Sequence, residues 1–368
     1  MEEEKDKCVD DFYPIFIFHL AVVSFLCIVG IFNLYSATYQ TGGRQYLTQL
    51  YWMFGGFIFM TILVFLDYRI FERFSYPFYF IVLVLLAAVL AVGPKIYGAR
   101  RWLDLGFFRF QPSELIKIGM VLILAKYFHD DHVVGGYTLR RLGVPFVILG
   151  APVLLILAEP DLGTALLICF VAFSIFMFVK MKWQSLFILF MVAVLTVPFA
   201  YKFVLKDYQR DRVRTFLDPS RDPRGKGYHA LQSMVAVGSG KIRGKGHLKG
   251  SQTQLAFLPE QHTDFIFSVF AEEHGFVGVF ILLIVYAMMI LMGLEISRHA
   301  RDKFGALLAI GMSAIFFWQS FVNIGMVTGI LPVVGITLPF FSYGGSSIII
   351  SFVGIGFLLS IHLRRFMF

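Results

Sequence analysis

Residues 258–275 read LPEQHTDFIFSVFAEEHG, and they place an acidic residue, Asp264, in the first turn of a long apolar segment. An ionisable side chain at the rim of a membrane-spanning helix is costly to desolvate, so it indicates a functional site. The apolar residues that follow Asp264 predict a helix long enough to cross a membrane. The stretch therefore predicts a membrane fold and also the position in that fold where chemistry is expected.

The composition of the whole chain supports a membrane fold. Of the 368 residues, 58% are hydrophobic and 15% are charged, and the mean hydropathy is +0.75, which excludes an ordinary soluble domain. A hydrocarbon core of roughly 30 Å requires about 20 mostly apolar helical residues. We therefore expect an all-α polytopic membrane protein with ten transmembrane helices. The ten stretches begin near Phe12, Leu47, Pro77, Glu114, Val144, Leu162, Gln184, Phe265, Phe304 and Gly344.

The Lys and Arg residues of the short loops predict the orientation of the chain. The loops on the side of the two termini are the richer in Lys and Arg, which places both termini in the cytoplasm. The apolar run 16–35 follows a net acidic leader and is too long for a signal-peptide core, so we expect it to remain as the first helix. Residues 1–368 then form a single membrane domain, and residues 201–263 form a long extracytoplasmic loop between the seventh and eighth helices.

The loop 201–263 is strongly basic, which predicts an anionic partner. Residues 201–217 and 228–237 have compositions suited to short helices in the membrane interface. The stretch 238–250, GSGKIRGKGHLKG, combines flexible glycines, free backbone amides and cations such as Lys241 and Lys245, a combination suited to a phosphate or pyrophosphate. Its spacing fits neither the Walker pattern nor GxGxxG. The alternative is attraction to anionic lipid headgroups, at about 1 kcal/mol for each cation.

A second segment that contains candidate functional residues is 98–120, GARRWLDLGFFRFQPSELIKIGM. Ser113 is placed to cap the fourth helix, and Glu114 and Lys117 lie three residues apart on one face of it. Two interpretations stay open: the pair faces a functional cavity, or it is an ion pair that satisfies itself at the interface.

The same segment places Trp102 directly after Arg100 and Arg101. A Trp beside two guanidinium groups suits a lipid phosphate or a stacked sugar ring. Trp is also common in the aromatic belt of any membrane protein.

Three further motifs fall on the same predicted side. In 159–164, EPDLGT, a tight turn with solvated acidic side chains is the favoured interpretation. Glu272 shares a helical stripe with Asp264, so it either extends a polar wall inward or pairs with a neighbouring helix. In 331–347, LPVVGITLPFFSYGGSS, the Pro and Gly residues predict an irregular re-entrant segment, which is tolerated at membrane depth only where it is buried or lines a wet cavity.

Five motifs occur in the order RRWLDLGFFRFQPSELIK, EPDLGTA, YQRDRVRTFLDPSRDP, FLPEQHTDFIFSVFAEEHGFVG and LPVVGITLPFFSYGGSS. With them the chain resembles the SEDS family (shape, elongation, division and sporulation) over nearly its whole length. WLDLG, AEEHG and LPVVG resemble the elongation branch, RodA, more than the division branch, FtsW.

The resemblance implies a glycosyltransferase that polymerises lipid II into peptidoglycan glycan strands, on the outer face of the bacterial cytoplasmic (inner) membrane, for cell elongation and rod shape. Asp264 matches the family's essential aspartate and would be the general base that activates the acceptor 4-hydroxyl. Basic groups would stabilise the undecaprenyl-pyrophosphate leaving group. The residues expected to bind substrate are Lys117, Glu114, Trp102, Arg100, Arg101, Gln111, Ser113, Arg212, Lys241, Lys245, Pro259, His262 and Glu272.

The resemblance also implies partners: lipid II and its lipid-linked glycan chain, a class B penicillin-binding protein, other elongation-complex proteins and membrane lipids, without nucleic acid. A divalent cation such as Mg²⁺ is compatible with pyrophosphate, but the sequence offers no ligand spacing for a dedicated metal site. Two alternatives stay open, a lipid II flippase and a noncatalytic scaffold for a penicillin-binding protein.

Overall fold

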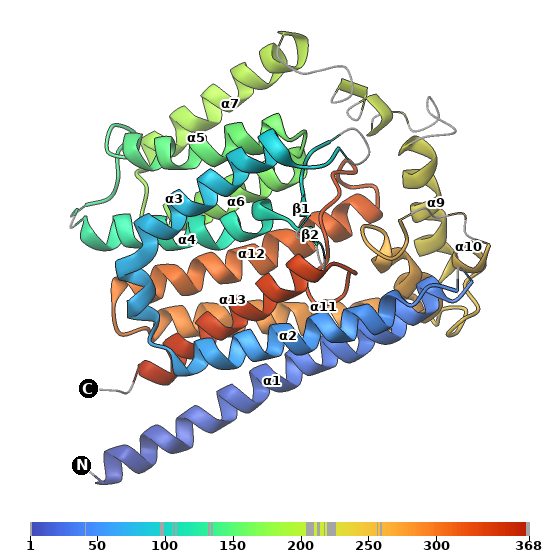
Figure 1. Ribbon diagram of the computed structural model, residues 1–368, viewed down its shortest axis with the longest axis horizontal. Helices are drawn as coiled ribbons and strands as arrows, with labels where there is room; N and C mark the ends of the chain where they lie inside the picture. Colours follow the sequence, from blue (N-terminus) through green and yellow to red (C-terminus); the bar gives the residue numbers. More distant parts are fainter. Residues whose placement is uncertain are drawn as a thin grey trace.

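The computed structural model describes residues 2–365 except 41, 96–98, 105, 107–108, 132, 134, 204–209, 212–213, 217, 219–225, 256 and 258–259. Two predicted site residues, Arg212 and Pro259, lie outside the described residues, as does much of the stretch 201–217 predicted to be interfacial. Helices dominate the described part of the chain (Figure 1).

The long helices are α1 (Glu2–Thr38), α2 (Gln45–Phe65), α3 (Tyr68–Val92), α4 (Pro112–Asp130), α5 (Gly143–Ala158), α6 (Leu162–Phe178), α7 (Trp183–Phe203), α11 (Ile266–Arg298), α12 (Lys303–Val327) and α13 (Gly345–Arg364). Between α7 and α11 lie the shorter helices α9 (Lys226–Ser239) and α10 (Ser251–Gln254). Strands β1 (Leu103–Asp104) and β2 (Arg109–Phe110) pair antiparallel, with Leu103 opposite Phe110. This small hairpin is absent from the sequence prediction.

Each predicted apolar stretch falls on one long helix, but not every start was right. α3 begins at Tyr68, after Asp67 accepts a hydrogen bond from the Arg69 amide, so Pro77 lies inside the helix and does not begin it. In the described part, six helices are long and apolar enough to cross a membrane: α1 from Phe16, α2, α3, α11, α12 and α13. Shorter apolar helices cover 143–158, 162–178 and 183–196. The chain is an all-α polytopic membrane protein.

The core of the bundle lies around α4 and α12, whose residues are buried along most of their length. α12 packs against α4, α6 and α11, and α2 packs along α13. Small residues permit this close approach: a Cβ on Gly311 of α12 would overlap the Val121 side chain of α4. Outward-facing apolar side chains such as Tyr51 (78% exposed) and Trp183 (77% exposed) suit a surface solvated by lipid.

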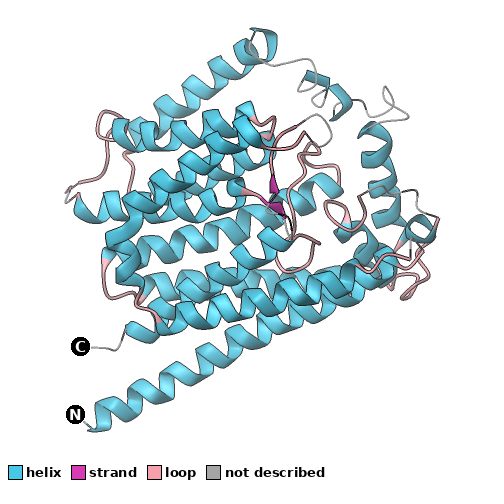
Figure 2. Cartoon of the chain, in the orientation of Figure 1, coloured by secondary structure: helices cyan, strands magenta, loops and turns pink. Residues whose placement is uncertain are grey.

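The two ends of the bundle differ. Both termini lie at one end, whereas β1, β2, α9, α10 and the loop between α12 and α13 gather toward the other (Figure 1). Most of the irregular backbone is found at that second end (Figure 2). The end of the bundle opposite the termini is therefore where non-helical backbone can hold a site.

Candidate active site

Asp264 lies in the turn that precedes α11, not in its first helical turn as the sequence predicted, because the helix begins at Ile266 with Phe265 as its N-cap. The side chain is partly exposed, whereas the residues from Phe265 to Ala271 are buried. Asp264 therefore stands where a buried helix meets the accessible end of the bundle.

Asn323 of α12 fixes the main chain at this position. Its side-chain Nδ2 donates to the carbonyl of Asp264 (3.0 Å) and to the carbonyl of Ile336 (2.6 Å). Gly335 has a φ of 78°, and a Cβ there would lie 3.1 Å from Asp264 Oδ2. The carboxylate thus lies against bare backbone at Gly335, and any larger residue would crowd it. The sequence interpretation missed both Asn323 and Gly335, although a lone Asn in an apolar helix was a usable signal.

The irregular segment predicted at 331–347 is confirmed as irregular from Leu331 to Gly344, and it is largely buried. Tyr343 donates its amide to the His262 carbonyl (2.9 Å), which ties the segment to the turn before α11. On the other side, a Cβ on Gly163 would lie 2.7 Å from the Val334 carbonyl oxygen. The segment therefore brings the motif at 159–164 and the motif at 258–275 to the same place.

The turn at 159–164 is confirmed, but its acidic side chains are buried and not solvated as predicted. Asp161 is 3% exposed and is the N-cap of α6, where it accepts hydrogen bonds from the amide and the hydroxyl of Thr164 in the first turn. Glu159 is fully buried. Arg101 binds the backbone here, donating from Nε to the Glu159 carbonyl (3.3 Å) and from Nη2 to the Pro160 carbonyl.

Arg100 has a similar role at another helix end, donating from Nη1 to the carbonyls of Leu90 (2.8 Å) and Ala91 (3.0 Å) in the last turn of α3. Both arginines thus stabilise the carbonyl ends of helices. Trp102 follows them half-buried, and its carbonyl lies against Gly93 at the end of α3. The predicted roles of these three residues toward phosphate or sugar remain predictions.

Glu114 and Lys117 form the ion pair that their spacing predicted, with Lys117 Nζ 2.7 Å from Glu114 Oε2. Lys117 is 1% exposed, so the ammonium is held inside the bundle and not at a solvated interface. Ser113 does not cap α4: Gln111 occupies the N-cap without a side-chain cap bond, and Ser113 Oγ is buried without a partner among the described residues. α4 packs against α12, the helix that carries Asn323.

Glu272 pairs with a neighbouring loop and with the start of α10, which is the second of the two roles predicted for it, a pairing with a neighbouring element. Its fully buried carboxylate binds Lys245 Nζ (2.6 Å) and accepts the amides of Gln252 (3.0 Å) and Thr253 (3.2 Å) at the start of α10. Glu273 similarly accepts the Leu248 amide (3.0 Å). The two acids hold the loop 238–250 in place. Because Lys245 is paired with Glu272, its charge is already neutralised within the protein.

Several backbone amides of that loop are also occupied by carbonyl groups, which leaves fewer amides free for a phosphate than the sequence predicted. The amide of Lys245 donates to the Glu272 carbonyl (3.0 Å), that of Gly246 to the Glu273 carbonyl (2.9 Å) and that of Gly244 to the Gly240 carbonyl (2.7 Å). Lys241 is exposed and has a φ of 49°. Its side chain is accessible to an anion, whereas the amides of Gly244, Lys245 and Gly246 are not.

His262 lies half-buried in the turn before Asp264. Burial lowers the pKa of the imidazole below its ordinary value of 6.5, and the Glu260 carboxylate opposes this shift. The ring is therefore neutral at pH 7 and can accept or donate a proton without adding charge.

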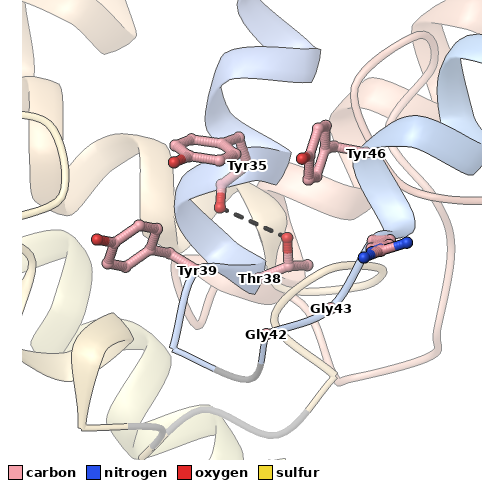
Figure 3. A pocket seen from close by; sticks show the side chains of 7 residues that line it. Tyr35, Thr38, Tyr39, Gly42, Gly43 and Tyr46 are labelled. Carbon is pink, nitrogen blue, oxygen red and sulfur yellow. Dashed lines mark hydrogen bonds between the residues drawn. The ribbon is translucent and has the colours of Figure 1, made fainter.

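A cavity of about 200 Å³ lies outside this cluster, at the junction of α1 and α2 (Figure 3). Tyr35 contacts Tyr39 and Tyr46 edge to face, with ring centroids 5.7 and 5.3 Å apart. The remaining lining residues are Thr38, Gly42, Gly43 and Arg44. The cavity contains none of the residues predicted to bind substrate.

Among the described residues, the group of side chains with metal-ligand spacing is Glu72, His129 and Asp130. Lys126 Nζ lies among them, 3.1 Å from Glu72 and 2.8 Å from Asp130. The group is at the end of α4 opposite Glu114, so it is separate from the candidate site.

The fold and the site together define a polytopic membrane protein with buried charged side chains and a partly exposed carboxylate at one end of its bundle. A family model described as "Cell cycle protein", for FtsW, RodA and SpoVE, matches residues 12–366. The chain belongs to this family, the SEDS family.

Individual relatives support the same family membership. The chain is 45% identical to the peptidoglycan glycosyltransferase MrdB of Escherichia coli K12 over 310 residues, covering 84% of this chain and 83% of the relative. It is 35% identical to a probable peptidoglycan glycosyltransferase FtsW of Trichlorobacter lovleyi over 357 residues, covering 93% and 91%.

Solved structures show the same fold. The rod shape determining protein RodA of Thermus thermophilus superposes with a TM-score of 0.70 at 31% identity, covering 94% of this chain and 96% of RodA. A chain of a peptidoglycan synthase complex superposes with a TM-score of 0.82 at 34% identity, covering 95% and 98%. The chain is thus a peptidoglycan glycosyltransferase of the RodA type, more similar to MrdB than to FtsW.

Proposed function

We propose that this glycosyltransferase polymerises lipid II, with Asp264 as the general base that removes the proton of the acceptor 4-hydroxyl. The observation that supports this role is the position of the carboxylate, partly exposed at the end of the bundle and fixed through Asn323 and Gly335. A positioned carboxylate is suited to take a proton as the hydroxyl attacks the donor sugar.

The leaving undecaprenyl pyrophosphate requires cations as its charge develops. Lys117 is the best candidate, since Glu114 fixes its position and the bundle shields it from water. A buried cation acts more strongly on an anion than an exposed one does, because the local dielectric is low. Trp102, Gln111 and Ser113 are proposed to bind the sugars near this pair. His262, Lys241 and the undescribed Arg212 and Pro259 remain further candidates.

We propose ten transmembrane helices in one membrane domain, with both termini in the cytoplasm of the bacterial inner membrane. The Asp264 end of the bundle then faces outward, where the loop 201–263 lies. The common position of the two termini, at the end of the bundle opposite α9 and α10, supports placing both termini on one side of the membrane (Figure 1). We also propose a class B penicillin-binding protein as the partner, because a solved relative belongs to a peptidoglycan synthase complex that couples polymerization and crosslinking.

The test supplies labelled lipid II to proteoliposomes that contain the protein and a partner synthase without its own glycosyltransferase. Glycan polymer from the wild type but not from Asp264→Asn would support the proposal. The matched control is Asp104→Asn, which alters a half-exposed carboxylate in the hairpin near the same end. Lipid II translocation without polymer would favour a flippase, and polymer that is equal in wild type and Asp264→Asn would contradict the proposed base.

A further inference from the structure

The loop 238–250 presents three exposed cations, Lys241, Arg243 and Lys249. No ion pair or hydrogen bond joins their side chains to the described part of the chain. Between the first two lies Ile242, which is 67% exposed. We call residues 241–243 the basic ledge. The exposed isoleucine gives this part of the loop an apolar side chain with a cation on each side.

The basic ledge is attached directly to a membrane-spanning helix. The amide of Phe276 donates to the Lys241 carbonyl (2.8 Å), and the amide of Val277 donates to the Ile242 carbonyl (3.1 Å). These bonds form where α11 departs from helical geometry, at Gly275. These two bonds fix the position of the ledge along the axis of α11, beside Phe276 and Val277.

The surface next to the ledge is apolar. Phe276 is 64% exposed, Val277 49% and Phe280 53%, and all three belong to the segment of α11 that is apolar enough to cross a membrane. Ile242 continues this apolar surface by one further side chain, and the cations flank it. Such a boundary, with apolar side chains below and cations at the edge, matches the border between acyl chains and lipid phosphates.

The ledge is also rigid, because Glu272 and Glu273 hold the rest of its loop from within. Lys245 forms an ion pair with Glu272, whereas the side chains of Lys241 and Arg243 have no partner in the described part of the chain. The fixed backbone holds the two cations near one position, so the binding of an anion has to order only their side chains.

We propose that the basic ledge is a binding site for the headgroup of an anionic phospholipid. Lys241 and Arg243 bind the lipid phosphates, and Ile242 enters the upper acyl region. A protein partner would require only complementary charge, whereas the continuity of Ile242 with the exposed face of α11 fits a lipid surface better. This proposal gives Lys241 a phospholipid in place of the lipid II substrate as its partner, and it does not depend on Asp264 as the base.

The test places the photoreactive amino acid p-benzoylphenylalanine at position 242, in nanodiscs of phosphatidylcholine with or without labelled phosphatidylglycerol. We expect crosslinks to phosphatidylglycerol in preference to phosphatidylcholine, and a yield at least about threefold lower when Lys241→Ala and Arg243→Ala are added. The same probe at position 280 reports acyl chains alone, so it should crosslink both lipids equally with or without the two substitutions.

Arg140→Ala with Arg141→Ala is the matched charge control, because it removes two exposed cations from a different loop. It should leave the yield at position 242 unchanged. Equal yields from the two lipids, no effect of the ledge substitutions, or crosslinks in native membranes to protein alone would each overturn the proposal. Polymerisation by Asp264 is not measured here, so failure of the catalytic proposal would be seen separately.

Discussion

Glu159 shows how the environment of one residue can alter its chemistry. Both of its carboxyl oxygens are buried without a hydrogen-bond partner among the described residues. Burial raises the pKa of Glu159 to about 8, the nearby charge of Asp161 raises it further, and Arg101 opposes the shift. The side chain is therefore mostly a neutral acid at pH 7.

This pKa predicts a pH dependence of stability. The folded protein keeps a proton that the unfolded chain loses at the ordinary pKa of 4.5, so stability is complete below that pKa and declines as pH rises toward about 8. The decline is at most about 1.4 kcal/mol per pH unit. Thermal unfolding in detergent should show a Tm that falls over this window for the wild type and changes much less for Glu159→Gln.

Glu260→Gln is the control for that series, because its side chain is 53% exposed. It should keep the pH dependence of the wild type. Parallel Tm curves for the wild type and Glu159→Gln would show that Glu159 is ionised in the folded protein, contrary to the structure.

Sequence patterns indicated some residues of the candidate site and not others. Asp264 was predictable because a charge beside a long apolar run is rare, and the Glu114–Lys117 pair followed from helical spacing. The burial of Glu159 was not predictable, since the segment that covers this turn comes from residues 331–344, far along the chain. Asn323 acquires its role only from the same tertiary contact.

Among the described helices, α11 contains a residue, Gly275, whose backbone angles are not helical. Gly275 has φ 64° and ψ −165°, which an L side chain rarely adopts. A Cβ there would overlap the Gly244 amide nitrogen, because the loop 238–250 lies directly on the helix backbone. The break frees the amides of Phe276 and Val277 to bond the loop. The contact between helix and loop therefore requires a glycine at position 275.

Gly275→Ala should destabilise the protein by about 2 kcal/mol or more, through backbone strain and displacement of the loop. The expected result is a clearly lower Tm in detergent, with faster amide hydrogen exchange at residues 241–246. Gly238→Ala in α9 is the matched control, because a Cβ there meets open space. If both substitutions left the Tm unchanged, the close contact between loop and helix would be wrong.

Helix positions were predicted well because apolar runs of membrane length are strong signals. The misplaced start at Pro77 arose because a proline often begins a helix, whereas here Asp67 caps α3 earlier and Pro77 is accommodated inside it. The hairpin of β1 and β2 was missed because two-residue strands carry no alternation to detect.

At the scale of the whole molecule, the motifs of the candidate site gather at one end of the bundle. The loop 238–250 and the turn at 159–164 lie at the end opposite the termini (Figure 1), and Asp264 is joined to that turn through the segment 331–344. This arrangement predicts that Lys249 faces outward and Arg141 faces the cytoplasm. In a variant without native cysteines, Lys249→Cys should react with an impermeant maleimide on intact spheroplasts.

Arg141→Cys should react only after the membrane is permeabilised. Both positions are exposed in the folded protein, so burial does not limit either reaction. The reverse pattern would place the candidate site in the cytoplasm, and equal labelling before permeabilisation would exclude a single orientation.

The most direct test of the central claim is the steady-state rate of lipid II polymerisation by wild type, Asp264→Asn and Asp104→Asn in the same partner complex. If Asp264 is the base, Asp264→Asn should lower kcat by about 10²–10⁴-fold while KM changes little, and Asp104→Asn should behave as the wild type. A kcat for Asp264→Asn within a few fold of the wild type, in a correctly folded complex, would contradict the assignment of Asp264 as the catalytic base.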